Sequence, residues 1–100
     1  MYKNIPYNIS VDWTVGFTKK AAKQAAKLKP KLQDTLKALM QEMMEHGPVR
    51  GDWPNYSKLP NGSHRCHLSY DYVACWRVVD NQIKIIEVYY AGSRKDAPYD

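Results

Sequence analysis

The sequence has only two cysteines and no long hydrophobic run. No stretch approaches the roughly 20 consecutive apolar residues that a transmembrane helix needs, and the first residues after Met1 lack the apolar core of a secretory signal peptide. Cys66 and Cys75 have no Cys-x-x-Cys spacing and no second cysteine pair to complete a zinc site. We therefore expect a cytoplasmic protein without membrane association, metal or cofactor, in which both thiols are buried and reduced.

Acidic residues are also scarce relative to basic ones. The 100 residues include 15 Lys and Arg against 10 Asp and Glu, which gives a formal net charge of +5. A chain of this length forms one domain, expected to span residues 1–100, because two hydrophobic cores do not fit. A small basic domain favours an acidic partner, with nucleic acid first and an acidic protein second.

The N-terminal half predicts one strand and a helical hairpin. Alternating apolar residues over 5–13 predict a half-buried strand. Thr18 is a suitable N-cap for a first helix, and Pro30 both ends that helix and suits the first turn of a second. Gly47 and Pro48 form a stop signal. The second helix carries apolar residues at helical spacing, namely Leu32, Leu36, Leu39, Met40 and Met43.

The C-terminal half predicts three further strands. They cover residues 63–69, 72–79 and 83–90, after a loop over 48–60 and before an irregular tail over 91–100. The apolar stripe of the second helix must be buried against this sheet. We therefore expect an α+β fold with the order β-α-α-β-β-β, in which an antiparallel sheet packs on an N-terminal helical hairpin.

The strand over 63–69 separates its side chains by parity. Cys66 and Leu68 point to one face, whereas Arg65 and His67 point to the other. The apolar pair should cover the helices, because the helices need an apolar surface to pack on. Arg65 and His67 are therefore expected on the face that points away from the helices.

The neighbours of this polar pair depend on the following turn. A two-residue turn at 70–71 places Cys66 opposite Cys75 and sets Trp76 beside His67, whereas a turn one residue longer changes the register. In the first register the polar face gathers a histidine, an arginine and aromatic rings. These groups suit proton transfer, phosphate binding and the stacking of unpaired RNA bases.

A basic stripe follows the first predicted helix. It consists of Lys19, Lys20, Lys23 and Lys27. Such a stripe is either a solvated helix face or a contact surface for nucleic-acid phosphates, and the spacing alone leaves both interpretations open.

Several short motifs in the second half of the chain form a recognisable set. They are Trp53-Pro54, Lys58-Leu59, residues 65–68, residues 73–78, residues 85–94 and residues 97–99. By these motifs the chain resembles the RelE/ParE superfamily of toxins from type II toxin–antitoxin systems, and most closely its RelE-like branch of translational repressors. The β-α-α-β-β-β order and the small basic chain agree with that family.

The resemblance implies a ribosome-dependent mRNA endoribonuclease, or mRNA interferase. In this family the ribose 2′-OH attacks the adjacent phosphate without a metal. That reaction needs a group that takes the 2′-OH proton, positive charge on the phosphate and protonation of the leaving 5′ oxygen. The implied partners are mRNA, ribosomal RNA, a cognate antitoxin protein, and operator DNA only as a complex with the antitoxin.

Site roles follow from the same resemblance. His67 would act as general base or acid, and Arg65 and Arg94 would stabilise the charge that develops on the phosphate. Asp71 would orient His67 or contact a base, and Tyr99 would stack on a nucleobase. The residues expected to bind RNA are Lys58, Trp76 and the basic stripe of Lys19, Lys20, Lys23 and Lys27.

Two alternatives share the fold and the charge. One is a ParE-like DNA gyrase inhibitor without nuclease activity. The other is a degenerate toxin that only binds its antitoxin and operator DNA, which stays open because many close relatives have His at the position of Arg94. Glu87 is a reserve candidate for the general base.

Overall fold

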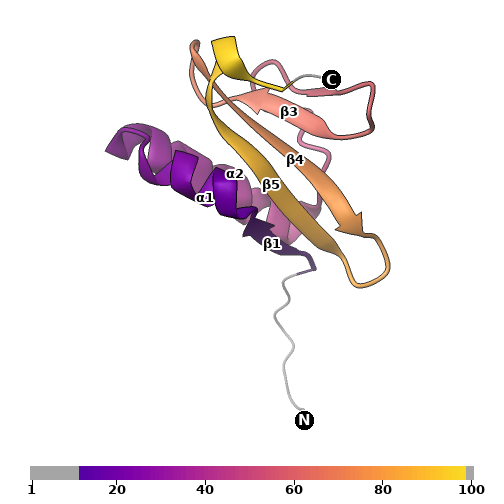
Figure 1. Ribbon diagram of the computed structural model, residues 1–100. Coiled ribbons are helices and arrows are strands. Elements are labelled where there is room, and N and C mark those ends of the chain that lie inside the picture. The colour runs from indigo at the N-terminus through magenta and orange to yellow at the C-terminus, as the bar shows by residue number, and fades with distance from the viewer. Residues whose placement is uncertain (1–11, 99–100) are drawn as a thin grey trace.

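The computed structural model describes residues 12–98, which form a sheet covered on one face by a pair of helices (Figure 1). The elements are β1 (Thr14–Phe17), α1 (Lys19–Ala26), α2 (Pro30–His46), β2 (Ser57–Lys58), β3 (His64–His67), β4 (Tyr72–Asp80), β5 (Ile85–Ser93) and the 3₁₀ turn η1 (Arg94–Asp96). The five strands lie in the order β1-β5-β4-β3-β2. The expected α+β fold is confirmed. Within residues 12–98, no helix is both long and apolar enough to cross a membrane.

The first strand differs from the expectation in place and direction. The strand expected over residues 5–13 lies outside the described residues apart from its last two positions, and β1 starts only at Thr14. β1 pairs in parallel with β5, from Thr14 opposite Ile85 to Phe17 opposite Val88. The sheet is therefore mixed rather than antiparallel, because the two intervening helices return the chain to the same end before the last strands begin.

The helix boundaries follow the predicted signals. The Oγ1 of Thr18 caps α1 by accepting a 3.0 Å hydrogen bond from the Ala21 amide. Pro30 occupies the first turn of α2, and Gly47 ends that helix with φ 94°. The Gln33 side chain donates to the carbonyl oxygens of Ala25 and Ala26 at the end of α1, at 3.1 and 3.2 Å, and so ties the start of α2 to that end.

The core lies between the helices and one face of the sheet. On α2, Leu36, Leu39 and Met43 are buried as predicted. α1 lies close to β5 because Ala21, a small residue, is fully buried at the contact. Gln24 adds a direct link, since its Oε1 accepts a 3.1 Å hydrogen bond from the Ala91 amide of β5. The sheet contributes Cys66, Ala74, Trp76, Ile86, Val88 and Ala91 to this core, and Leu68 joins them from the turn after β3.

The β3–β4 register differs by one residue from the predicted pairing. The turn is longer than expected, because the Leu68 amide donates a 2.7 Å hydrogen bond to the Tyr72 carbonyl across an intervening 69–71 segment. Arg65 therefore lies opposite Cys75, and the predicted pairing of Cys66 with Cys75 is wrong. Cys66 faces the helices and Cys75 faces away from them. Both thiols are free and buried, as expected.

The longer turn also corrects the position of Trp76. Its side chain is fully buried in the core on the helix side, and its Nε1 donates a 2.9 Å hydrogen bond to the Pro48 carbonyl. The predicted position of Trp76 beside His67 is therefore wrong. A ring without exposed surface offers no stacking platform to RNA.

The last strand, β5, contains a β-bulge that affects the sheet face not covered by the helices. Cys75 pairs with Tyr90 while Trp76 pairs with Val88, so Tyr89 has no partner on β4. Both tyrosines consequently pack on the side of Cys75, away from the helices. β5 continues to Ser93, beyond the end expected at residue 90.

We expect Leu36→Ala to lower the free energy of unfolding by roughly 2–4 kcal/mol, because the leucine is 3% exposed within the core and its removal leaves a cavity. The exposed neighbour Lys37 provides the matched control, Lys37→Ala, which should change stability by less than about 0.5 kcal/mol. Urea denaturation of both variants measures the difference. Equal stability of the two variants would contradict the placement of the core.

Candidate active site

The candidate site lies on the sheet face that the helices leave open. Its floor is a small apolar cluster of Val73, Cys75 and Tyr90 from the central strands β4 and β5. Arg65 and His67 stand on the neighbouring strand β3, with Arg65 opposite Cys75 and His67 opposite Val73. Parity therefore places this pair on the predicted face.

The irregular segment before β2 holds His67 in place. The His67 amide donates a 2.8 Å hydrogen bond to the Pro54 carbonyl, and the ring Nδ1 lies 3.4 Å from the Nδ2 of Asn55. The residue is 7% exposed. Asn55 was not predicted from the sequence, because it lies in a loop without periodicity, and its positive φ of 53° is visible only in the structure.

The surroundings of His67 favour its neutral form. Burial lowers the pKa of the ring below its ordinary value, the guanidinium groups of Arg65 and Arg94 lower that pKa further, and the backbone of Ser69 acts in the opposite direction. A neutral imidazole can accept a proton near neutral pH. Both arginines act on this one ring, so the structure brings three of the predicted site residues together.

Arg65 is oriented by the edge strand. Its Nε donates a 3.1 Å hydrogen bond to the Oγ of Ser57, the residue that pairs with it on β2. Ser57 is a second positioning residue that the sequence did not indicate, because a strand of two residues shows no alternation. The contact fixes one edge of the guanidinium group beside the histidine.

Arg94 reaches the site from the C-terminal side. It opens η1, and its amide donates a 2.7 Å hydrogen bond to the Asp71 carbonyl in the β3–β4 turn. Its guanidinium group lies 4.9 Å from the centre of the Tyr70 ring, which is 75% exposed. The chain after β5 is thereby attached to the turn that follows His67.

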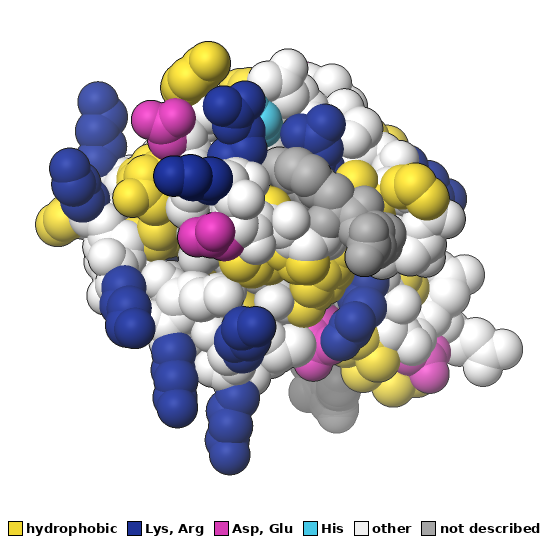
Figure 2. Space-filling model, turned by 45° about the horizontal axis from the view of Figure 1, so that its top comes forward, with side chains coloured by type: hydrophobic (Ala, Val, Ile, Leu, Met, Phe, Trp, Pro, Cys, Tyr) yellow, Lys and Arg dark blue, Asp and Glu magenta, His cyan; other side chains and the backbone are white. Residues whose placement is uncertain are grey.

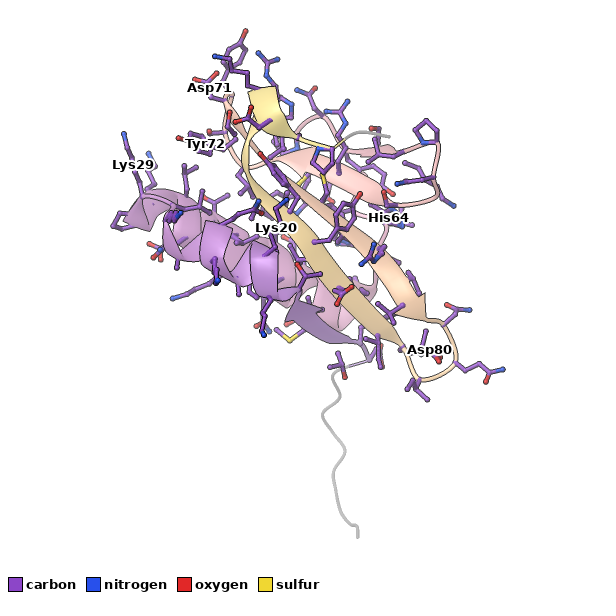
Figure 3. The ribbon with its side chains drawn as sticks, in the orientation of Figure 1. Lys20, Lys29, His64, Asp71, Tyr72 and Asp80 are labelled. Atoms are coloured by element: carbon purple, nitrogen blue, oxygen red, sulfur yellow. The ribbon has the colours of Figure 1, made fainter. Side chains whose placement is uncertain are left out.

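The Asp71 side chain has a different environment from the expected one. It lies at the turn end of β4 (Figure 3) and lines a cavity of about 220 Å³ with Ser93, Arg94 and Lys95. Within residues 12–98 no hydrogen bond or ion pair joins its carboxylate to His67. Asn55 occupies the place next to the ring that an orienting carboxylate would need.

Two further candidates lie apart from this group. Glu87 forms an ion pair of 2.9 Å with Arg77, its register partner on β4, further along the sheet than Cys75. Tyr99 lies outside the described residues.

His64 belongs to the opposite face of β3. It is 4% exposed and stacks on Trp76, with ring centroids 5.8 Å apart, while the Tyr56 hydroxyl lies 2.7 Å from its Nδ1. Burial lowers its pKa, and Lys58 lowers it further. We assign this histidine to the packing of the sheet edge.

Cations are spread over the molecular surface. Lys19, Lys20, Lys23 and Lys27 are exposed along α1, and Lys58 is exposed on β2. Figure 2 shows Lys and Arg side chains scattered among hydrophobic and other groups on the visible face, with fewer acidic side chains and a histidine between basic groups. Among residues 12–98 there is no group of three or more His, Cys, Asp or Glu side chains able to hold a metal ion.

The fold is that of the RelE-like toxins of toxin–antitoxin systems. A chain of the RelE–RelB complex from the archaeon Pyrococcus horikoshii superposes with a TM-score of 0.71 at 18% identity, over 86% of this chain and 99% of that one. The YoeB dimer from Staphylococcus aureus gives 0.67 at 12% identity, over 83% and 98%. A chain of the DinJ–YafQ complex from Escherichia coli gives 0.67 at 13% identity, over 85% and 96%. No family model and no curated protein matches the sequence.

We expect Arg94→Gln and Arg65→Gln each to raise the pKa of His67, because each removes a positive charge that opposes protonation of the ring. An NMR titration of the His67 ring measures the change. Arg77→Gln is the matched control, since that guanidinium is paired with Glu87 and does not act on His67. An unchanged pKa in both test variants would show that the arginines do not converge on the ring.

Proposed function

We propose that this protein is the toxin of a type II toxin–antitoxin system and acts as a ribosome-dependent mRNA endoribonuclease. The observation that carries the proposal is the placement of His67 beside Arg65 on the open face of a RelE-like fold, where the charges of Arg65 and Arg94 both act on its ring. A buried histidine with a lowered pKa is a proton acceptor, and paired guanidinium groups beside it suit a phosphate.

The proposed reaction needs no metal. His67 takes the proton of the ribose 2′-OH, and the 2′ oxygen attacks the adjacent phosphorus. The bond from phosphorus to the 5′ oxygen breaks, and that oxygen takes up a proton from the histidinium or from water. The products are a 2′,3′-cyclic phosphate and a 5′-OH. Arg65 and Arg94 stabilise the extra negative charge on the phosphate oxygens in the transition state.

An antitoxin is the proposed protein partner. Proteins with this fold have been solved as the RelE–RelB, DinJ–YafQ and YoeB–YefM complexes. The net charge of +5 would attract an acidic antitoxin segment to the surface that otherwise meets RNA. Operator DNA would be bound only by the complex of the two proteins.

We expect His67→Ala to slow cleavage by roughly 100- to 10,000-fold because it removes a proton-transfer group. Arg94→Ala should slow it by roughly 100- to 1,000-fold because it removes one preorganised donor. Single-turnover cleavage of mRNA on programmed ribosomes measures both rates. His46→Ala is the matched control, since this histidine is exposed at the end of α2.

Antitoxin binding provides the test of folding for these variants. Both should retain it, because Arg94 is exposed and the His67 ring lies outside the main core. Parental cleavage rates in both variants would contradict the assigned site. A parental protein that inhibits gyrase and cuts no RNA would instead establish the ParE-like alternative.

We expect the basic stripe on α1 to assist binding to ribosomal RNA without a part in the chemistry. Replacing Lys19, Lys20, Lys23 and Lys27 by Gln should weaken ribosome binding and flatten its dependence on salt, since fewer phosphate contacts release fewer counterions. The cleavage rate at saturating protein should stay at the parental value. Ribosome binding that is unchanged at low salt would identify the stripe as a solvated face.

A further inference from the structure

A second polar pocket lies on the open face, beyond the candidate active site. It has a volume of about 290 Å³ and forms where the β2–β3 turn meets strands β4 and β5. It is lined by Asn61, Gly62, Ser63, Arg77, Val78 and Tyr89. Its size is at the lower end of the range for small-molecule sites, which suits a single planar group.

A directed chain of hydrogen bonds fixes one wall of this pocket. Asn61 Oδ1 accepts from the amide and the Oγ of Ser63, at 3.0 and 2.6 Å. Since an amide oxygen only accepts, the Ser63 hydroxyl proton is used there, and the Tyr89 hydroxyl at 2.7 Å must donate to the Ser63 oxygen. The Asn61 amide therefore has a set orientation, and no hydrogen bond within residues 12–98 engages its Nδ2 donor.

The opposite wall is the Arg77 guanidinium group, which is held by Glu87 and lies over the Tyr89 ring. Arg77 donates to Glu87 Oε1 through Nε at 3.3 Å and Nη2 at 2.9 Å, and its Cζ lies 5.0 Å from the centre of the Tyr89 ring. The side chain is still 51% exposed. Because Glu87 compensates its charge, this arginine attracts a phosphate less strongly than an unpaired one, while its flat face remains open to a base.

The pocket and the candidate active site lie on one continuous surface. Ser63 precedes Arg65 by two positions on the chain, and Arg77 follows the register partner of Arg65 by two positions on β4. Same-face residues on a strand are about 7 Å apart. Asp71 and Asp80 mark the two ends of β4 (Figure 3). His67 and Arg65 lie toward the Asp71 end, and the pocket lies toward the Asp80 end.

We propose that this pocket binds one unpaired nucleobase of the RNA substrate, next to the nucleotide whose phosphate is cleaved, and that it makes cleavage sequence-selective. The base stacks on the Arg77 plane, which is itself stacked on Tyr89. The Asn61 Nδ2 donates to an acceptor on the edge of the base. The proposal rests on the proposed function, because it assigns a second contact to the RNA that the candidate active site would cleave.

The test uses a His67→Ala background, in which cleavage should be roughly 100- to 10,000-fold slower, and ribosomes programmed with an mRNA that carries one fluorescent 2-aminopurine beside the cleaved phosphate. Saturable quenching of the fluorescence reports stacking of that base. Arg77→Ala in this background should weaken binding by roughly 5- to 150-fold, which corresponds to the loss of one stacked base. Lys84→Ala is the matched control, because Lys84 is a cation on the same hairpin that lies over Trp13 instead.

Arg77→Lys separates a base site from a phosphate site. Lysine keeps the charge but has no plane, so a base site should lose the quenching as it does in Arg77→Ala, whereas recovery of parental affinity would overturn the proposal. Unchanged binding in Arg77→Ala would also overturn it. Circular dichroism of each variant verifies folding.

Sequencing of cleaved mRNA ends gives the second measurement. With His67 intact, Asn61→Ala should broaden the preferred cleavage sites, because loss of the contact to the base lowers the rate at the best site toward the rates at other sites. An unchanged preference would contradict the subsite. A parental protein that cuts no RNA, yet shows Arg77-dependent quenching, would refute the nuclease function and leave the base pocket standing.

Discussion

The structure depends on one constraint: the sheet has helices on only one of its faces. The apolar stripe of α2 and the small-residue surface of α1 need a dry partner, and alternate side chains of β3, β4 and β5 provide it. The remaining side chains of the same strands must therefore meet solvent or a ligand. The open face keeps only a small apolar floor around Cys75, and polar groups surround that floor.

Polar residues on this face are held by segments that come from outside the central strands. Asn55 and Ser57 approach from the edge, whereas Arg94 approaches from the chain end beyond β5. The result is a histidine on which two cations act, and both of them lower its pKa. Two guanidinium groups acting on one titratable side chain are typical of a site arranged for an anionic ligand.

The sequence predicted those features that depend on local chemistry. Thr18, Pro30 and Gly47 mark helix ends because capping and φ restrictions act within a few residues. The face of Arg65 and His67 was predictable because alternation along one strand does not depend on its neighbours. Cross-strand neighbours were not predictable in this way. One additional residue in the 69–71 turn shifted the register and moved Trp76 into the core.

Other features have no periodic signal. β2 has only two residues and cannot show alternation. The parallel pairing of β1 depends on the path of the intervening chain, and Asn55 lies in a loop. The bulge at Tyr89 is likewise invisible to a pattern of period two. For this reason Tyr89 and Arg77 could not be recognised from sequence as walls of one pocket.

The bulge at Tyr89 also determines to which face of the sheet each later side chain of β5 points. Ile86 and Val88 face the helices before it, and Ala91 does so after it, although strict alternation would bring Tyr90 to that side. A one-residue deletion at Glu87, before the bulge, would reverse the facing of the residues after it and direct a tyrosine toward α1, where an alanine now fits. It would also reverse the approach of the chain to Arg94. The length of this strand is therefore as constrained as its composition, and natural variants of the fold should tolerate substitutions in β5 far better than insertions or deletions.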